Sequence, residues 1–325
     1  MKEFDIRPDA LFENYLRLAE SDAKKYFSDA PRNQIKCPAC RSDGNSIFNK
    51  AGFTYQECPE CRTLFVSPRP SADAFNRYYI ESDSSKFWAT KFYKETAAAR
   101  REKIWKPKAK MIRSIMDRKN LLDANLVDIG GGYGLFAEEM SLLTGKDVTV
   151  IEPAPHLAEA CREKGLPVIE CFLEEIETSA LPETPRFYVS FELFEHLHDP
   201  GLFLKQLRRV MAKDDVFVFT TLSGVGADIR ALWQDSKSVV PPHHLNFFNP
   251  FSIKILLENN GFTTLETTTP GRLDIDILCN NRKHIKDRFW QIFVEQANLD
   301  QKESMQSLLA STGFSSHMMV VSCIH

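Results

Sequence analysis

The sequence predicts an α/β protein with a doubly wound, mostly parallel sheet of seven strands, preceded by a small β module and a helical connector. From residue 121 onward, short β-branched runs alternate with helical runs, as expected for parallel strands joined by helical crossovers. Residues 33–70 instead carry short extended runs between Cys, Gly and Pro, which is typical of a small β unit. A chain of 325 residues, 43% of them hydrophobic, is long enough for two or three folded units.

The elements follow in chain order. Apolar residues at helical spacing predict an N-terminal helix within 1–32, and 71–120 is expected to form a helical connector. The domain predicted over 121–325 has a helical insertion at about 272–311. Its seven expected strands are the runs LVDI, VTVIEP, PVIECF, FYVSFE, VFVFTTL, TTLETTT and HMMVVSCIH.

Charge is distributed unevenly along the chain. The formal net charge is −3, which argues against a protein that coats nucleic acid, yet residues 91–119 hold eleven Lys or Arg against three acids, a local charge of +8. No signal sequence and no run of about 18 apolar residues is found. We therefore expect a cytoplasmic protein without membrane insertion, and the sequence makes no prediction of its oligomeric state.

Four cysteines form two CxxC pairs, Cys37 with Cys40 and Cys58 with Cys61, separated by seventeen residues. Each pair can form a tight knuckle, and two knuckles supply the tetrahedral thiolate shell that structural zinc prefers. A segment with so few apolar residues needs such a staple to fold. The sequence predicts a structural zinc site, because four sulfur ligands leave no coordination position open for catalysis.

A glycine turn follows the first strand of the predicted sheet. In LVDIGGGYG, Asp128 ends the strand, and Gly130, Gly132 and Gly134 let the chain turn sharply and let a ligand approach the backbone. Glu152 ends the next strand, where an acid can accept hydrogen bonds from both hydroxyls of a ribose. The pattern indicates a nucleotide-containing cofactor, and a nicotinamide dehydrogenase is the competing interpretation of the turn alone.

Together with EHLHDP after the fourth strand and HHLNFF after the fifth, this turn resembles the class I S-adenosylmethionine-dependent methyltransferases. The resemblance implies that S-adenosylmethionine is the cofactor. It implies that Asp128 lies near the cofactor's amino group, that Glu152 holds the ribose and that Phe172 packs on the adenine where many relatives carry an acid. The expected cofactor-binding set is completed by Gly130, Gly132, Gly134 and Phe191.

The motif ExxEH, formed by Glu192, Glu195 and His196, follows the fourth strand. On a helix these three residues share a face, and they could hold a divalent ion together with His244. This arrangement is similar to metal-assisted O-methyltransferases that use magnesium or manganese. The alternative, which we favour, is a metal-free site in which His196, His243 or His244 acts as general base, supported by Glu195.

The whole chain resembles the zinc-ribbon methyltransferases of bacterial surface-polysaccharide pathways. This resemblance implies O-methylation of a sugar, either nucleotide-linked or in a glycan, and the connector's positive charge suits a diphosphate. Carbon methylation of a keto-sugar remains open. An RNA methyltransferase that binds RNA through the zinc ribbon and the connector is a less favoured alternative, and a non-catalytic cofactor-binding regulator is a third.

Overall fold

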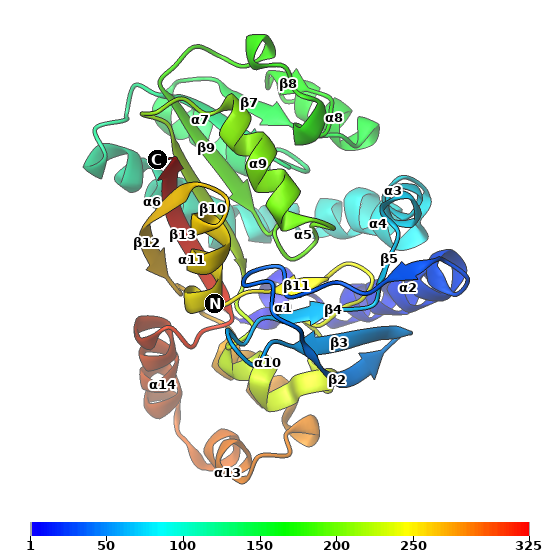
Figure 1. Cartoon of the computed structure of the whole chain (residues 1–325). Coiled ribbons are helices and arrows are strands. Elements are labelled where there is room, and N and C mark those ends of the chain that lie inside the picture. Colours follow the sequence, from blue (N-terminus) through cyan, green and yellow to red (C-terminus); the bar gives the residue numbers. More distant parts are fainter. Residues whose placement is uncertain (1, 325) are drawn as a thin grey trace.

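The computed structural model describes residues 2–324 and has a seven-stranded sheet at its centre (Figure 1). The strands lie in the order β12 (Phe262–Thr268), β13 (His317–Ile324), β10 (Val216–Leu222), β9 (Arg186–Phe191), β6 (Asn125–Ile129), β7 (Val148–Ile151) and β8 (Val168–Ile169). β13 runs antiparallel to both of its neighbours, and the other pairs are parallel. The predicted fold class is confirmed. The strand order reverses between β6 and β9, which is where ligands of doubly wound sheets bind.

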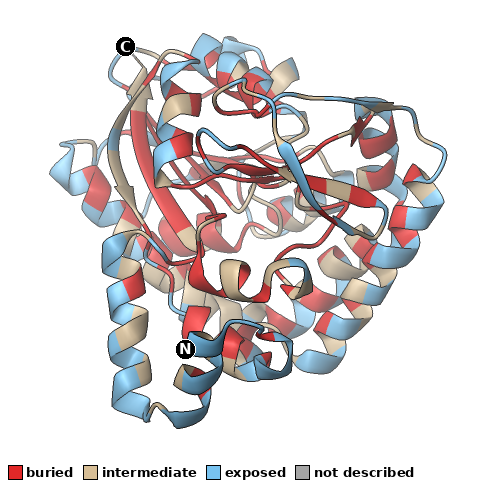
Figure 2. Ribbon diagram, turned by 60° about the horizontal axis from the view of Figure 1, so that its bottom comes forward, coloured by how far each residue is buried: buried red, intermediate tan, exposed pale blue. Residues whose placement is uncertain are grey.

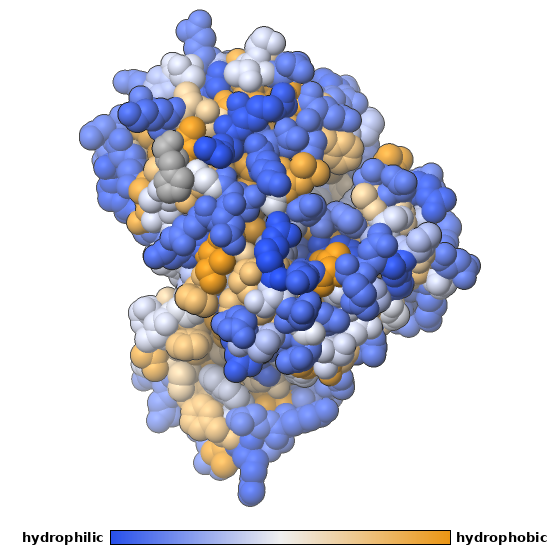
Figure 3. Space-filling model, in the orientation of Figure 1, coloured by the Kyte–Doolittle hydropathy of each residue, from blue (hydrophilic) through white to orange (hydrophobic). Residues whose placement is uncertain are grey.

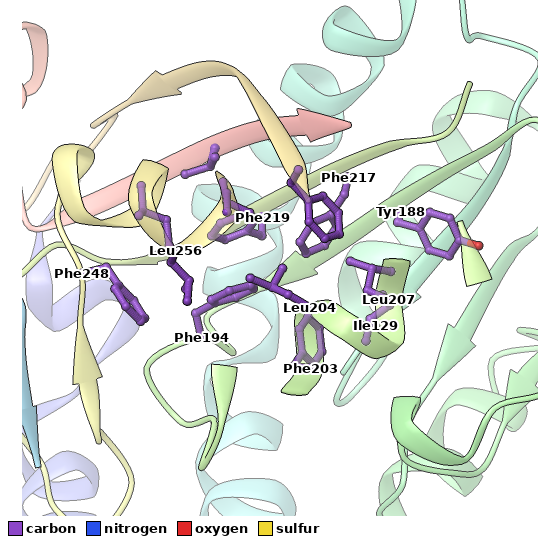
Figure 4. Close-up of a cluster of buried hydrophobic side chains, with 14 of the residues drawn as sticks. Ile129, Tyr188, Phe194, Phe203, Leu204, Leu207, Phe217, Phe219, Phe248 and Leu256 are labelled. Atoms are coloured by element: carbon purple, nitrogen blue, oxygen red, sulfur yellow. The ribbon is translucent and has the colours of Figure 1, made fainter. Parts of the chain in front are cut away.

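Alternate side chains of the central strands enter two separate cores. On β9, Phe187 and Val189 pack on the face covered by α6 (Lys106–Arg118) and α7 (Leu135–Thr144). Tyr188 packs on the opposite face, against α9 (Pro200–Val210). Figure 4 shows this second core, where rings from β9 and β10 meet side chains of α9 and α11 (Pro250–Glu258). Every residue of β9 is buried, as expected for a strand covered on both faces.

The four-cysteine module packs on this second core and shares a sheet with the main domain. Its strands are β2 (Asn45–Lys50), β3 (Phe53–Glu57) and β4 (Leu64–Val66). A fourth strand, β11 (Asn246–Phe247), comes from the HHLNFF segment and pairs antiparallel with β4. The sequence did not indicate this strand, because two residues are too few to show a period. The module is therefore joined by backbone hydrogen bonds to a loop at the sheet's ligand-binding edge.

Helices surround these sheets. The N-terminal region forms α1 (Glu3–Ile6) and α2 (Asp9–Phe27), and β1 (Arg32–Asn33) pairs with β5 (Arg69–Pro70). The connector range forms α3 (Ala72–Glu81), α4 (Asp83–Phe87), α5 (Tyr93–Arg100) and α6, joined by two short π-helical segments. The remaining helices are α8 (Pro155–Arg162), α10 (Ala227–Leu232), α12 (Asp274–Asn280), α13 (Arg288–Gln296) and α14 (Leu299–Thr312).

The buried residues are concentrated on the central sheet, whereas most residues of α13 and α14 are exposed (Figure 2). Apolar surface shows at the lower end of Figure 3, over α13, where Phe289 and Ile292 are exposed. Within residues 2–324, no helix combines the length and the apolar character needed to cross a bilayer.

Candidate active site and four-cysteine centre

The glycine turn leaves β6 in a conformation that favours glycine. Gly130, Gly132 and Gly134 have φ values of 71°, 57° and 71°. A Cβ placed on Gly132 would meet no atom within 4 Å, so the backbone there borders open space. A Cβ on Gly134 would lie 2.8 Å from Sγ of Cys161. Gly132 thus leaves room beside the turn, whereas Gly134 allows α7 and α8 to pack closely.

Two buried carboxylates lie beside this turn. Asp128 is 1% exposed, and its Oδ2 has no hydrogen-bond partner within residues 2–324. Burial, and then the charge of Glu152, raise the pKa of Asp128 to about 7. Glu152 accepts hydrogen bonds from the backbone N–H groups of Gly132 at 2.9 Å and Ala154 at 3.0 Å. An unpartnered buried carboxylate beside open backbone fits a ligand with a cationic group, such as the amino group of S-adenosylmethionine.

The two predicted aromatic residues lie in different surroundings. Phe172 is 42% exposed and follows β8, so its ring is accessible to a ligand. Phe191 ends β9 and packs edge-on against Phe136, with ring centroids 4.5 Å apart. It also contacts the ring of Trp105, and it belongs to the core between the sheet and α6.

Three residues with metal-ligating or basic groups converge beyond β9. One ligand atom each from Glu195, His196 and His244 lies within 4.8 Å of the others. The helix on which the three ExxEH residues would share a face does not form, since the segment is a turn in which Glu192 has a φ of 53°. Glu192 lies outside the group formed by Glu195, His196 and His244. Its Oε1 instead accepts a hydrogen bond of 2.7 Å from the hydroxyl of Thr220.

Glu192 has two nitrogen-bearing neighbours, Lys108 and His317, that no sequence motif indicates. Its Oε1 lies 3.4 Å from Nζ of Lys108 and 3.4 Å from Nδ1 of His317. Burial alone would raise the pKa of Glu192, but the charges of His317 and Lys108 outweigh it and hold that pKa well below its usual range. Lys108 is itself buried, and its burial lowers its pKa. Its helical spacing from Trp105, three residues before it, and Ile112, four residues after it, is a signal of burial in the sequence.

Burial determines the protonation of the group formed by Glu195, His196 and His244. It lowers the pKa of His196 to about 4 and that of His244 to about 3, where the nearby His196 adds to the effect. Burial and the charge of Glu192 raise the pKa of Glu195 to about 8, and its Oε2 accepts a hydrogen bond of 2.8 Å from Thr221. Near neutral pH both imidazoles are therefore uncharged and carry a lone pair, as a general base or a metal ligand must.

The four-cysteine module orients His244. Tyr55, on β3 of the module, donates a hydrogen bond of 2.7 Å to the carbonyl of His244. The Nδ1 of His244 lies 2.6 Å from the carbonyl of Ser238, and a proton on Nδ1 leaves the lone pair on Nε2. The N–H of Leu245 binds the carbonyl of Glu195 at 2.6 Å and holds the two loops together. His243 instead hydrogen-bonds the hydroxyl of Tyr78 and lies outside the group.

The cysteines form a compact centre. Sγ of Cys37 lies 3.5 Å from that of Cys61, and Sγ of Cys40 lies 3.4 Å from that of Cys58. Four thiolates at about 2.3 Å from a tetrahedral zinc would lie about 3.8 Å apart, so the observed arrangement is close to what the ion requires. Burial raises the pKa of Cys58 to about 11 and so disfavours the thiolate. A bound cation would favour the thiolate and reverse this effect.

Both cysteine pairs have the same backbone geometry. In each, the first cysteine's N–H binds the carbonyl five residues on, and its carbonyl accepts from the N–H four residues on. The residue at that fourth position has a left-handed φ, 67° at Arg41 and 58° at Arg62. Two identical knuckles that face one another are the arrangement predicted from CxxC spacing, and the group could hold zinc.

A comparison with protein families identifies the family to which this chain belongs. Residues 90–267, more than half of the chain, match the model of a methyltransferase domain family. The chain belongs to this methyltransferase family. The predicted enzyme class, an S-adenosylmethionine-dependent methyltransferase, is confirmed at this level.

Individual relatives are more distant. The ubiquinone biosynthesis O-methyltransferase of Xanthomonas oryzae pv. oryzae is 30% identical over 153 residues, which cover 44% of this chain. The matched region spans 64% of the length of that curated relative. Among solved structures, the magnesium protoporphyrin IX methyltransferase of Synechocystis PCC 6803 is similar, with a TM-score of 0.47 and 10% identity, over 74% of this chain and 97% of that one.

Proposed function

We propose that this enzyme methylates an oxygen atom of a small acceptor, with His244 as the general base. The convergence of His244, His196 and Glu195 beyond β9 carries this proposal, since it gathers two neutral imidazoles and a carboxyl group at the edge where such sheets bind ligands. A general base must be unprotonated to act, and burial keeps both imidazoles neutral, although the same lowering of the pKa weakens each imidazole as a proton acceptor. His244 is the better oriented, because its Nδ1 is engaged by Ser238 and its Nε2 retains the lone pair.

The cofactor half of the proposal rests on the glycine turn. When bound, S-adenosylmethionine supplies an electrophilic methyl group. The unpartnered Oδ2 of Asp128 would receive the amino group, and the open space at Gly132 would admit the ligand against the backbone. Glu152 would exchange its present backbone hydrogen bonds for those of the ribose. Phe172, exposed beyond β8, would cover the adenine.

The same three residues also suit a second chemistry, catalysis by a divalent metal ion. Glu195, His196 and His244 offer one oxygen and two nitrogens, a half-shell that suits magnesium or manganese. Such an ion would chelate neighbouring hydroxyls of the acceptor and lower the pKa of one. Glu195 would have to ionise for this role, and its pKa of about 8 opposes that until an ion binds. We therefore favour the metal-free base.

The acceptor in this proposal is a sugar, nucleotide-linked or within a glycan, as the resemblance to zinc-ribbon methyltransferases of surface-polysaccharide pathways implies. The Xanthomonas relative is named as an O-methyltransferase, which favours oxygen over carbon. An RNA acceptor is less favoured, because the edge of β4 already pairs with β11 and the knuckles pack on the main core. In this proposal the cysteines hold a structural zinc that supports the acceptor side of the site.

The test is release of S-adenosylhomocysteine from S-adenosylmethionine with three acceptor pools: nucleotide sugars, catechols and total RNA. We expect release with nucleotide sugars, and a loss of about a hundredfold in kcat for His244→Gln, which is the usual worth of a general base. His284→Gln is the matched control, because His284 is exposed. Equal activity of the two variants would exclude His244 as the base, and release with RNA alone would replace the sugar by RNA.

A further inference from the structure

The helical insertion lies at the ligand-binding edge of the central sheet and carries features that methyl transfer does not use. It connects the end of β12 to the start of β13. Because β13 runs antiparallel to β10, its first residue, His317, lies opposite Leu222 at the end of β10. Figure 1 shows α13 at the lower end of the molecule, beyond this edge. A partner that docks on α13 is therefore on the same side of the molecule as the acceptor.

One face of α13 is packed, and apolar side chains are exposed on another. Val294 is buried in a small core with side chains of α10, α12 and α14, and Trp290 and Phe293 pack partly against this core. Phe289 and Ile292 are instead 58% and 56% exposed. The ring of Phe289 lies 5.3 Å from that of Trp290 and 6.1 Å from that of Phe293, between centroids. These four residues form a continuous apolar patch, the α13 patch, on a helix that its own core holds in place.

Exposed cations lead into the α13 patch. Residues 282–288 hold four exposed Lys or Arg against one acid, a local charge of +3: Arg282, Lys283, Lys286 and Arg288. None of these four side chains has an ion pair or a hydrogen bond within residues 2–324. The acid is Asp287, which accepts a hydrogen bond of 3.0 Å from the N–H of Trp290 and so caps α13. The next acids, Glu295, Asp300 and Glu303, follow the patch in the chain.

We propose that residues 282–296 dock the enzyme on the surface of an anionic lipid bilayer. Phe289 and Ile292 enter the boundary between headgroups and acyl chains, and the four cations contact lipid phosphates. Trp290, partly exposed beside them, has the amphipathic ring that favours this depth. A helix of nine residues lies in the interface and does not cross the bilayer. The inference is independent of the proposed function, because neither the patch nor the cations belong to the methyl-transfer site.

A second copy of the chain fits this surface less well. Two side chains the size of Phe289 and Ile292 bury at most roughly 500 Å², whereas an interface of standard size takes roughly 800 Å² from each partner. In a twofold contact across α13, the basic segments of the two copies would also lie near one another and repel. An anionic bilayer complements the cations and the apolar side chains together, and an apolar patch of this kind is otherwise unfavourable in water.

The test is co-sedimentation of the full chain with two kinds of vesicle, pure phosphatidylcholine and an equal mixture of phosphatidylcholine and phosphatidylglycerol. We expect binding to the mixed vesicles, about tenfold or more weaker binding to the pure ones, and weaker binding to the mixed vesicles at high salt. The double variant Phe289→Ser with Ile292→Ser should lower affinity for the mixed vesicles about tenfold or more, and so should Lys283→Gln with Lys286→Gln.

Two matched controls remove the same kinds of side chain elsewhere. Leu142→Ser changes an apolar residue that is 73% exposed on α7, and Lys110→Gln with Arg113→Gln removes two exposed cations of α6. Both controls should bind mixed vesicles as the wild type does. Thermal unfolding and the affinity for S-adenosylhomocysteine should be unchanged in every variant, because all the substituted side chains are exposed.

Three results would overturn the proposal. They are no binding of the wild type to mixed vesicles, equal affinity for the two kinds of vesicle, and equal binding by the wild type and both α13 variants. Sedimentation velocity tests the second copy: a wild-type dimer that dissociates in Phe289→Ser with Ile292→Ser, without vesicle binding, would assign the face to self-association instead. Failure of S-adenosylhomocysteine to bind the wild type would contradict the proposed function and leave the vesicle results unaffected.

Discussion

The cofactor side and the acceptor side of this site are built differently. Asp128 lies on β6, the glycines form the turn that follows this strand, and Glu152 comes directly after the adjacent strand β7. The acceptor side instead gathers His244 from a loop tied to the cysteine module and Lys108 from the connector. The first side depends on one local conformation, whereas the second depends on how distant segments pack. Substitutions far from the site should therefore disturb the geometry of the acceptor side and leave that of the cofactor side unchanged.

Loss of the four-cysteine centre should have the largest effect. We expect about one equivalent of zinc in the purified protein, and Cys58→Ser should lower the free energy of unfolding by several kcal/mol, because the binding energy of a structural metal is folding energy. Turnover should also be lost, because β11 would no longer pair with β4 and the neighbouring His244 would lose its position. Metal analysis and thermal unfolding measure this, with Cys279→Ser as control, since Cys279 lies outside the cluster. Freshly purified protein without zinc would contradict the prediction.

Gly132→Val tests the cofactor side alone. The added side chain would occupy the open space beside the turn, so affinity for S-adenosylmethionine should fall about a hundredfold or more. Gly145→Val is a matched control, because Gly145 also has a positive φ, 69°, and equally open space, but caps the far end of α7. Both variants bear the same backbone strain, so equal cofactor affinity in the two would remove Gly132 from the binding site.

Glu195→Gln distinguishes the two chemistries on the acceptor side. It keeps the shape of the side chain but cannot ionise. With a metal-free base we expect kcat to fall by less than about tenfold, and a chelator should have little effect, since Glu195 is already mostly protonated near neutral pH. With a divalent ion, both treatments should abolish turnover, and added magnesium or manganese should restore only the chelated wild type. Retention of activity after both treatments would favour the base.

The pH dependence of cofactor binding should follow Asp128. Its pKa of about 7 in the free protein means that it carries a proton below that pH. A cationic ligand favours the ionised carboxylate, so binding must release the proton, and affinity should fall about tenfold per pH unit below 7. Affinity should be greatest near pH 7 to 7.5 and fall again toward pH 8.5, because the cofactor's own amino group, like other α-amino groups, loses its proton at about pH 8. Calorimetry from pH 5.5 to 8.5 measures this, and Asp128→Asn should bind weakly at every pH. A flat wild-type profile would separate Asp128 from the cofactor's amino group.

The same contrast explains what the sequence revealed about the site. The turn after β6 and the CxxC knuckles depend on residues close together in the chain, so spacing was enough to find them. His317 lies in the last strand and meets Glu192 only because β13 pairs with β10. Tyr55 reaches His244 only through the pairing of β4 with β11. No local pattern records such contacts, because they arise from the packing of segments distant in sequence.

Tyr55→Phe should have the smallest effect and tests this link most directly. It keeps the ring that packs on Phe48 but removes the hydroxyl that holds the His244 carbonyl. Tyr188→Phe is the control, since it also loses a buried hydroxyl that binds a carbonyl, that of Val210, away from the acceptor side. Each should lose about 1 kcal/mol of stability.

Only Tyr55→Phe should also lower kcat, by about threefold to tenfold, because a small displacement of a base weakens proton transfer. Its affinity for S-adenosylmethionine should stay unchanged, since the hydroxyl reaches the His244 loop and the cofactor turn follows β6. If both variants lower kcat equally, the effect is one of stability alone. If cofactor affinity falls with kcat in Tyr55→Phe, the two sides of the site are mechanically coupled, and the division between them is wrong.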